Sequence, residues 1–256
     1  MSQVTTGYAP VNGLQMYYEV HGAGRPLVLL PGGVTTIDLS FGDLIPGLAA
    51  NRQVIATELQ GHGRTADIER DIELGYLAGD VAALLDHLGI GQADVLGFSL
   101  GGGTALQLAL DHPDRVGRLI LASVSYAGDG YHEEITDPAR YATSTRMPTA
   151  DDFLQMRDAY ARLAPDPGHF EVFAGKVSRA ANNMKGWTAA ELGSITAPTL
   201  LVFGDHDFIR LEHAVETHGL IPGAQLAVLP HATHMDVMRR TDLLLPIVQD
   251  FLAEAD

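Results

Sequence analysis

Three polar side chains of this sequence, Ser99, Asp207 and His234, each follow a short apolar run that predicts a buried strand. A serine hydroxyl is a weak nucleophile near neutral pH unless a base lies within hydrogen-bond reach and a third group orients that base. An imidazole and a carboxylate can supply these two roles. We therefore expect acyl-transfer or hydrolytic chemistry if the fold brings the three side chains together.

Ser99 lies in the stretch Asp94–Gly103, which reads Asp-Val-Leu-Gly-Phe-Ser-Leu-Gly-Gly-Gly. An apolar run precedes the serine and a helical pattern from Thr104 to Leu110 follows it, the context in which Gly-x-Ser-x-Gly indicates a nucleophile elbow. Side chains at positions 97 and 101 would collide with the crossing strand and helix, so glycine is needed there. The turn exposes the hydroxyl and places backbone N–H groups where they can hold an oxyanion. The alternative interpretation is a glycine-rich turn with an incidental serine.

Apolar runs that alternate with helical patterns predict the elements that position these groups. The alternation is typical of a mostly parallel sheet with helices on both faces, so the predicted fold class is α/β. Functional groups in such sheets lie beyond the carboxyl ends of the strands, so these loops should meet at one edge. The predicted strands are 14–20, 27–30, 54–56, 95–96, 119–122, 199–203 and 225–229. The predicted helices are 76–88, 104–110, 212–220 and 241–253, together with a roughly helical stretch over 39–48 that Pro46 and Gly47 interrupt.

The dipeptide Asn12-Gly13 is a turn signal in front of the first apolar run, Leu14–Val20. We expect this run to form an antiparallel edge hairpin with the strand Leu27–Leu30. Leu27–Leu30 is apolar throughout, as expected of a strand that is buried on both faces. It ends in Pro31-Gly32-Gly33, whose backbone amides could face the serine.

The strand signal is absent between Tyr126 and about Gly193. Two amphipathic helices are predicted there, on either side of Pro165–Gly168. We interpret the segment as a helical insertion over the strand ends, which divides the chain into a core of residues 1–125 and 194–256 and an inserted cap of residues 126–193. The apolar positions of the two helices are Phe153, Met156, Tyr160 and Leu163, and then Phe170, Phe173, Val177, Ala180 and Met184.

Length and composition limit the class of protein further. A chain of 256 residues with 46% hydrophobic content is enough for one α/β domain with an inserted subdomain. The net charge of -16 argues against nucleic acid or an anionic membrane as a partner. The absence of cysteine excludes disulfides, thiolate catalysis and cysteine-based metal sites. The first ten residues carry no secretory signal and no apolar run approaches a membrane span, so we expect a cytoplasmic monomer or homodimer.

Six motifs carry a resemblance to a known family. They are Tyr-Glu-Val-His-Gly (18–22), Leu-Val-Leu-Leu-Pro-Gly-Gly (27–33), Gln-Gly-His-Gly-Arg-Thr (60–65), Gly-Phe-Ser-Leu-Gly-Gly (97–102), Ala-Pro-Thr-Leu-Leu-Val-Phe-Gly-Asp-His-Asp (197–207) and Pro-His-Ala-Thr-His (230–234). On these motifs the chain resembles the α/β-hydrolase superfamily over nearly its whole length, in particular small esterase- and lactonase-like serine hydrolases. The resemblance implies the α/β-hydrolase fold, with a mostly parallel central sheet and a helical cap that forms the substrate pocket.

The resemblance also implies a role for each matching position. Ser99 matches the family's nucleophile, Asp207 matches the acid that ends its Gly-x-x-Asp loop, and His234 matches its base. The chain order of serine, acid and histidine is the order of this family. The oxyanion hole is expected from the backbone N–H groups of Gly33 and Leu100.

Neighbouring residues offer alternatives at the acid, at the base and in the oxyanion loop. Asp205 lies in the same loop as Asp207, and we expect its side chain to cap that loop. His231 is a rival base to His234, and we expect it to be a solvated loop residue. The family usually has histidine where this chain has Pro31, which bears on the shape of the pocket floor and leaves the backbone donors in place.

We predict a serine hydrolase that needs no cofactor or metal and cleaves a small carboxylic ester or lactone through an acyl-enzyme. A C–C bond hydrolase, a perhydrolase or an acyltransferase on the same three groups stays open, as does a ligand-binding sensor that retains the fold, because pocket shape and water access separate these classes. His62, in the motif 60–65, is interpreted as structural. The predicted substrate-binding residues are Val34, Phe98, Tyr126, Trp187, Phe208 and Met235.

Overall fold

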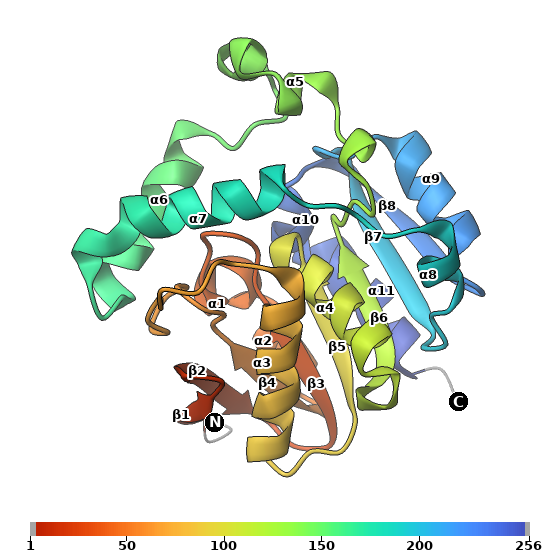
Figure 1. The fold of residues 1–256 in the computed structure, drawn as a ribbon. Coiled ribbons are helices and arrows are strands. Elements are labelled where there is room, and N and C mark those ends of the chain that lie inside the picture. The colour runs from red at the N-terminus through yellow and green to blue at the C-terminus, as the bar shows by residue number, and fades with distance from the viewer. Residues whose placement is uncertain (1–3, 254–256) are drawn as a thin grey trace.

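At the centre of the molecule is one eight-stranded sheet, as the computed structural model of residues 4–253 shows (Figure 1). Its order is β1-β2-β4-β3-β5-β6-β7-β8, with parallel pairs from β4 to β8 and antiparallel pairs on both sides of β2. The predicted α/β class is therefore confirmed, although the outermost residues of the predicted core, 1–3 and 254–256, lie outside the described range. The strands are β1 (Thr5–Val11), β2 (Leu14–His21), β3 (Arg25–Leu30), β4 (Arg52–Thr57), β5 (Ala93–Phe98), β6 (Val116–Ala122), β7 (Thr199–His206) and β8 (Gln225–Thr233).

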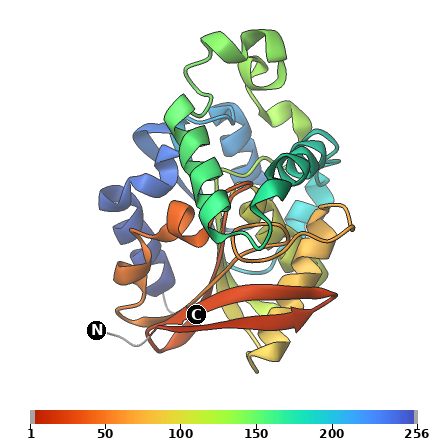
Figure 2. The same cartoon turned by 90° about the vertical axis from the view of Figure 1, so that its left-hand side faces the viewer.

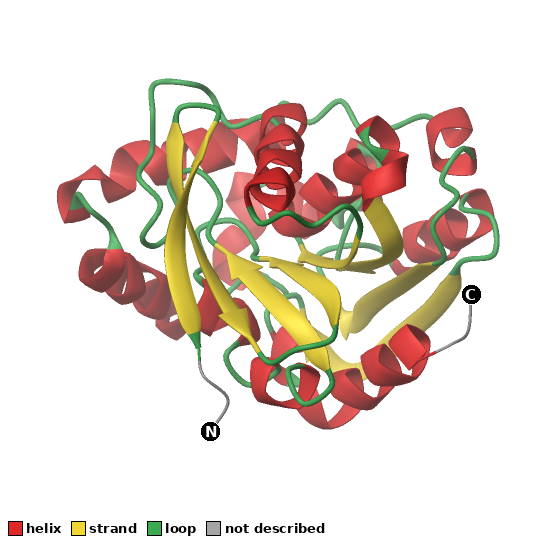
Figure 3. Ribbon diagram, turned by 90° about the horizontal axis from the view of Figure 1, so that it is seen from below, coloured by secondary structure: helices red, strands yellow, loops and turns green. Residues whose placement is uncertain are grey.

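Helices cover both faces of the sheet, as Figure 3 shows from below. The helices are α1 (Ile37–Phe41), α2 (Ile45–Leu48), α3 (Leu74–His87), α4 (Leu100–Asp111), α5 (Glu133–Thr136), α6 (Ala150–Leu163), α7 (Phe170–Asn182), α8 (Ala189–Gly193), α9 (Leu211–Leu220), α10 (Asp236–Arg239) and α11 (Thr241–Ala253), with 3-10 helices η1 (Pro113–Arg115), η2 (Gly128–Gly130), η3 (Pro138–Thr143) and η4 (Pro167–His169). Helices α3 and α4 bury Leu84 and Leu108 in the apolar layer on one face. Helices α1 and α11 bury Phe41 and Phe251 in the layer on the other.

The central strands are apolar because both of their faces are covered. Every residue of β5 is buried, and so are the last four residues of β3. Burial of apolar surface on both sides contributes roughly 25 cal/mol per Å² of area removed from water, which holds these strands in the centre of the sheet. Because β5, β7 and β8 run parallel, their carboxyl ends lie at one edge of the sheet, where the chain presents Ser99, Asp207 and His234.

The predicted edge hairpin is present, but the predicted pairing of Leu14–Val20 with Leu27–Leu30 is wrong. Asn12-Gly13, both at positive φ, turns β1 into β2, so the hairpin forms with Thr5–Val11 (Figure 2). On its other side β2 pairs antiparallel with β4, from Tyr18 opposite Thr57 to His21 opposite Val54. The strand β1 contains glycine and proline, which weaken a strand pattern, and the β2–β4 pairing joins distant parts of the chain.

Other boundaries also differ from the predicted ones. Strand β7 continues to His206 and β8 to Thr233, because these two residues pair beyond the expected ends of both strands. The helix expected over 39–48 is two short helices, since Pro46 lies in the first turn of α2 and starts a helix instead of interrupting one. The elbow helix begins at Leu100, directly after Ser99, and not at Thr104.

The segment between β6 and β7 contains the two expected amphipathic helices as α6 and α7, which Figures 1 and 2 show above the sheet, with α5 and η3 farther from it. Met156 and Tyr160 of α6 and Phe173 of α7 are buried. Phe153, predicted in the same apolar stripe, is 52% exposed, because α6 lies at the outside of the molecule and contacts it along a narrow face. Within residues 4–253 we find no helix with the length and apolar character to cross a membrane.

Candidate active site

Ser99 lies between the end of β5 and the start of α4, in a backbone conformation that side chains rarely adopt. Its φ is 52° and its ψ is -115°, which is strained for a residue with a Cβ. A side chain at position 97 would meet the backbone of Gly101, and one at position 101 would meet the carbonyl groups of Leu30 and Pro31. The glycines therefore allow the close crossing of strand and helix that the sequence predicts for a nucleophile elbow.

The fold brings Ser99, His234 and Asp207 into one hydrogen-bonded chain. The Ser99 Oγ lies 3.0 Å from His234 Nε2, and His234 Nδ1 lies 2.7 Å from Asp207 Oδ1. The imidazole and the carboxylate are both buried. With the proton on Nδ1 donated to the carboxylate, Nε2 can accept the serine proton, so the arrangement can activate a nucleophile.

Asp207 accepts hydrogen bonds from other groups in addition to His234. Its Oδ1 also accepts from the backbone N–H of Phe208 at 2.7 Å, and its Oδ2 accepts from the hydroxyl of Ser123 at 2.5 Å and from the N–H of Gly204 at 3.3 Å. Burial raises the pKa of Asp207, but attraction to His234 and the hydrogen bonds outweigh it, so the pKa is lowered overall. Asp207 is consequently a fixed anion beside the imidazole.

Ser123 was missed as a site residue by sequence reasoning. Ser123 directly follows β6 at a φ of 56°, and its hydroxyl donates to Asp207. A serine carries no charge that would mark it in a sequence. The one signal that could have found it is its place directly after a buried parallel strand next to β7, at the edge where the acid lies.

The rival residues lie apart from this hydrogen-bonded chain. Asp205 Oδ1 accepts from the N–H of Ala232 at 3.0 Å and contacts His206, so it joins the ends of β7 and β8 as a capping side chain. His231 is exposed and has a positive φ of 53°. Asp207 and His234 therefore belong to the hydrogen-bonded chain that contains Ser99, whereas Asp205 and His231 do not.

The loop after β3 brings Gly33 next to Leu100, the residue that follows the serine. A side chain added to Gly33 would lie 3.7 Å from the Cβ of Leu100. The first N–H groups of a helix have no intrahelical partner, so the Leu100 amide at the start of α4 is available to an oxyanion. With proline at position 31, the loop is closed by Thr35 and Ser40, which hydrogen bond to the backbone of Gly32.

A comparison with models of known protein families shows to which family this chain belongs. The family model described as the alpha/beta hydrolase fold matches residues 25–168, more than half of the chain. The chain belongs to the α/β-hydrolase fold family. The predicted resemblance is thereby confirmed, and the protein is an enzyme of the hydrolase type.

Relatives of this α/β-hydrolase carry several activities in their names. The 2-hydroxymuconate semialdehyde hydrolase of Pseudomonas sp. (strain CF600) is 32% identical over 95% of this chain and 92% of that protein. The pimeloyl-[acyl-carrier protein] methyl ester esterase of Neisseria meningitidis (serogroup B / serotype 15, strain H44/76) is 30% identical over 83% of this chain and 87% of that protein. The crystal structure of the enol-lactonase of Burkholderia xenovorans LB400 superposes with a TM-score of 0.74 at 25% identity, over 96% of this chain and 100% of that chain.

Two of the predicted pocket residues of this α/β-hydrolase contact the imidazole of His234 directly. The ring of Phe208 stacks on His234 with centroids 3.9 Å apart and planes at 9°, and the ring of Phe98 lies 5.1 Å from it. Val34, in the oxyanion loop, is half-buried and has a φ of 64°. Apolar rings around an imidazole exclude water from it, which strengthens the polar contacts it keeps.

The other predicted pocket residues have packing partners of their own. Tyr126 stacks on His213, and the indole N–H of Trp187 donates to Gln107 at 2.8 Å. Met235 is buried in the apolar layer that contains α11. These contacts explain the positions of the three side chains, while their part in substrate binding stays a prediction.

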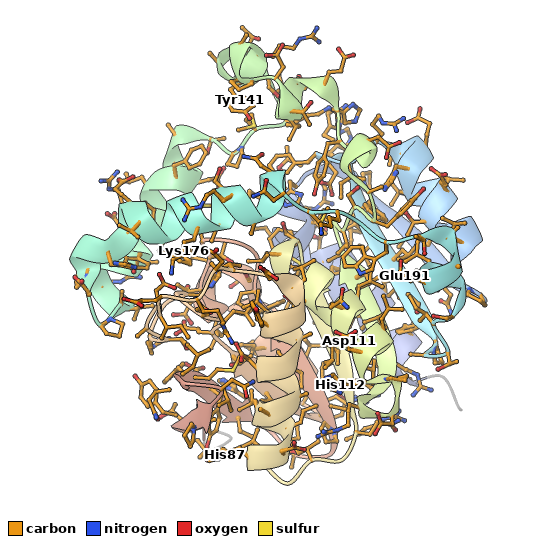
Figure 4. All side chains as sticks on the ribbon, viewed as in Figure 1. His87, Asp111, His112, Tyr141, Lys176 and Glu191 are labelled. Carbon is orange, nitrogen blue, oxygen red and sulfur yellow. The ribbon has the colours of Figure 1, made fainter. Side chains whose placement is uncertain are left out.

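Helix α7 lies over the oxyanion loop. The sequence predicted this helix but not its position over the loop. The Cγ1 of Val177 lies 2.9 Å from the position that a side chain on Gly33 would take. The helix is tied to the loop after β4 by Lys176, labelled in Figure 4, which pairs with Asp67 at 2.8 Å and donates to the carbonyl of Ile68. Val177 was expected only as part of an apolar stripe, and its place over Gly33 depends on these long-range contacts.

Proposed function

We propose that this α/β-hydrolase is a serine hydrolase that cleaves a small carboxylic ester or lactone through an acyl-enzyme. The observation that supports the proposal most is the continuous chain of hydrogen bonds from Ser99 through His234 to Asp207. Such a chain activates a hydroxyl that is otherwise a poor nucleophile. The strained turn that carries Ser99 agrees with this function, because strain of this kind persists where it exposes a reacting group.

In the proposed mechanism Ser99 Oγ attacks the carbonyl carbon while His234 Nε2 takes its proton. The N–H groups of Gly33 and Leu100 hold the oxyanion of the tetrahedral intermediate. His234 then protonates the departing alkoxide, and Asp207 stabilises the imidazolium that forms between the two transfers. A water molecule that His234 deprotonates attacks the acyl-enzyme and releases the acid, which restores the serine.

The surroundings of the serine favour an acyl group without charge. Phe98, Phe208 and Val177 give the site apolar walls near the base and the oxyanion loop. Two cations close to these walls already have carboxylate partners: Lys176 pairs with Asp67, and Arg146 pairs with Glu134 at 2.8 Å. The net charge of -16 also repels anions at long range. We therefore place neutral esters and lactones before substrates with a free carboxylate.

Residues 126–193 are, on this proposal, a cap that selects the substrate and leaves the chemistry to the core. The proposed nucleophile, base and acid all lie outside this range. The segment supplies Val177 above Gly33 and reaches the acid loop through Arg146, whose Nη1 donates to the carbonyl of Asp207 at 2.9 Å. A change in the segment would thus alter the space above Ser99 without removing a reacting group.

Cleavage of a C–C bond next to a ketone is the second candidate. The 32% identity to a semialdehyde hydrolase over 95% of the chain favours it. The same serine could attack a ketone, but the leaving group would then be a carbon atom that must be protonated. The substrate of such a reaction would also carry a free carboxylate. The paired state of Lys176 and Arg146 is the reason to rank this candidate second.

The proposal is tested with a panel of substrates on the wild type and on Ser99→Ala. The panel contains neutral p-nitrophenyl esters with acyl chains of two to eight carbons, five- and six-membered lactones, and a 2-hydroxy-6-oxodienoate. We expect the highest kcat/KM for an ester or lactone and no turnover by Ser99→Ala above background. The highest kcat/KM for the dienoate would move the second candidate to first place. Peptide mapping of a fluorophosphonate adduct to a residue other than Ser99 would refute the proposed nucleophile.

A further inference from the structure

His62 is a buried histidine next to the oxyanion loop, and the mechanism proposed above gives it no part. It lies in the loop 58–65 that follows β4 and has 0% exposure. Its Nε2 lies 3.2 Å from the backbone nitrogen of Val34, and its Nδ1 lies 3.0 Å from the carbonyl oxygen of Gln60. An N–H group donates and a carbonyl oxygen accepts, so the two contacts together require a neutral ring with its proton on Nδ1.

The direction of the Gly33 N–H depends on the two peptide planes on either side of this residue, and hydrogen bonds fix both planes. The plane between Gly32 and Gly33 is fixed through its carbonyl, which accepts from the N–H and the hydroxyl of Thr35 at 3.2 and 2.8 Å. In a trans peptide the N–H points away from the carbonyl, so this plane aims the Gly33 N–H away from Thr35. The next plane, between Gly33 and Val34, is fixed through its N–H by His62.

The oxyanion loop needs support from outside because it is both flexible and strained. Gly33 has no Cβ and can adopt many backbone conformations, most of which would turn its N–H away from the serine. Val34 has a φ of 64°, which a β-branched residue adopts only when its surroundings impose it. The hydrogen bond from Val34 to His62 is a contact that can impose it.

The loop 58–65 is built to hold this acceptor in place. Glu58, fully buried in the same loop, accepts hydrogen bonds from Arg64 and from the backbone N–H of Ile37, so the loop is also attached to the start of α1, which follows the oxyanion loop. The ring of Phe173 from α7 meets the imidazole edge to face at 4.8 Å. Burial lowers the pKa of His62 to about 4, against the opposing effect of its backbone hydrogen bonds and of Asp67, which keeps the ring neutral at pH 7.

We propose that His62 is a positioning residue for catalysis: its Nδ1–H tautomer holds the Gly33–Val34 peptide and thereby keeps the Gly33 N–H aimed at the oxyanion that forms when Ser99 attacks. The inference rests on the proposed serine-hydrolase function. The oxyanion exists in the transition state and not in the bound substrate, so a displaced Gly33 lowers kcat and leaves KM nearly unchanged. Loss of a whole oxyanion donor costs about 10²–10³-fold in kcat, and displacement of one should cost less, about 10–100-fold.

Two substitutions of similar size test this role. In His62→Gln the side-chain amide reaches the position of Nε2 and its oxygen can accept from Val34, whereas the shorter side chain of His62→Asn reaches only the position of Nδ1. We expect His62→Asn to lower kcat for a p-nitrophenyl ester about 10–100-fold with KM within about 2-fold of the wild type. His62→Gln should recover most of the loss. Urea unfolding of both variants shows whether the folded population is comparable.

Several results would overturn the role of His62. One is an unchanged kcat in His62→Asn, and another is an equal loss in both variants that follows their loss of stability. The wild type offers a test that needs no substitution: ¹⁵N–¹H spectra of the imidazole should show the neutral ring with its proton on Nδ1, and a proton on Nε2 would contradict the hydrogen bond from Val34. A wild type that neither turns over esters nor is labelled at Ser99 would refute the proposed function itself, and the role of His62 with it.

Discussion

The carboxyl edge of the sheet and the segment between β6 and β7 are held in different ways. At the edge, Asp207 is buried and accepts hydrogen bonds from His234, from Ser123 and from two backbone N–H groups. The segment has buried contacts with the core too, such as the pair of Lys176 with Asp67, but α6 also meets the core through an ion pair with a more exposed side chain. Arg239 of the core, which pairs with Asp152 of α6, has a side-chain exposure of 39%.

From this difference we expect catalysis to depend on the edge of the sheet and substrate selection to depend on the segment. A buried polar group with several partners has one geometry, because every alternative leaves a donor or an acceptor unsatisfied. Exposed ion pairs are worth about 0–1 kcal/mol each and constrain a helix much less. We therefore expect substitutions at the edge to change the rate for every substrate alike, and substitutions in the segment to change the ranking of substrates.

The largest effect is expected at the nucleophile and the base. Ser99→Ala and His234→Gln should each lower kcat about 10⁶-fold for all substrates of the panel, because each removes the proton transfer that activates the attack. His231→Gln is the matched control, since His231 is exposed and lies outside the hydrogen-bonded chain. Steady-state kinetics on purified variants give the measurement. A severe loss in His231→Gln with an active His234→Gln would reverse the assignment of the base.

The next effect is expected at the acid. Asp207→Asn should lower kcat about 10⁴-fold, because an amide in place of the carboxylate can favour the wrong tautomer of His234. Asp205→Asn serves as the control, since Asp205 caps the strand ends and does not contact the imidazole. The ratio of the two kcat values is the readout. Equal losses would mean that both aspartates act only by holding the ends of β7 and β8.

A smaller effect is expected from His62, which lies where the core meets α7. Its titration should make the free energy of unfolding depend on pH. The pKa of His62 is about 4 in the folded protein and about 6.5 in the unfolded chain, so below pH 6.5 the unfolded chain binds a proton that the folded protein does not. As the pH falls from 6.5 to 4 the wild type should lose about 3 kcal/mol of its free energy of unfolding through this group, with no further loss below pH 4.

Urea unfolding of the wild type and of His62→Gln at pH 7 and pH 4 isolates this contribution. The variant lacks the titrating ring, while the neighbouring Asp67 and Lys176 are the same in both proteins. The stability difference between the two pH values should therefore be smaller in His62→Gln. The same pH dependence in both proteins would show that other groups account for it.

The smallest effect tests the segment itself. Val177→Ala should change the ratio of kcat/KM between short and long acyl chains about 10-fold, because it removes methyl groups that lie above Gly33. Val172→Ala, on the same helix but 54% exposed, should leave that ratio unchanged. Labelling of Ser99 by a very small phosphonate should proceed at the same rate in both variants. An unchanged ratio in Val177→Ala would indicate that the core loops set the preference.

The sequence was sufficient for groups that carry their own local signal. Gly97 and Gly101 mark the elbow because only glycine permits the close crossing, and the apolar run of β3 marks a strand with two covered faces. The rule that parallel strands end at one edge predicted that Asp207 and His234 lie at the edge where Ser99 lies, while their choice over Asp205 and His231 came from the family resemblance.

Contacts between distant residues carried no such signal. The pairing of β2 with β4, the hydrogen bond from Ser123 to Asp207 and the contact of Asp67 with His169, 102 residues away, depend on how separate elements meet. Phe153 shows the same limit, since its helical spacing was right and its exposure was decided by what lies next to α6. The cytoplasmic location and the oligomeric state stay predictions from composition.

One hydrogen bond joins Tyr126, the first residue of the inserted segment, to Trp187, near its end. The N–H of Trp187 donates to the carbonyl of Tyr126 at 2.8 Å, so the chain leaves the core and returns to it at nearly the same point. The entropy of closing a loop grows only with the logarithm of its length, so an insertion of another size at this junction would cost the core little more. A different segment could therefore replace this one at the junction, in evolution or by engineering. The exchange would change the substrate specificity and leave Ser99, Asp207 and His234 in place.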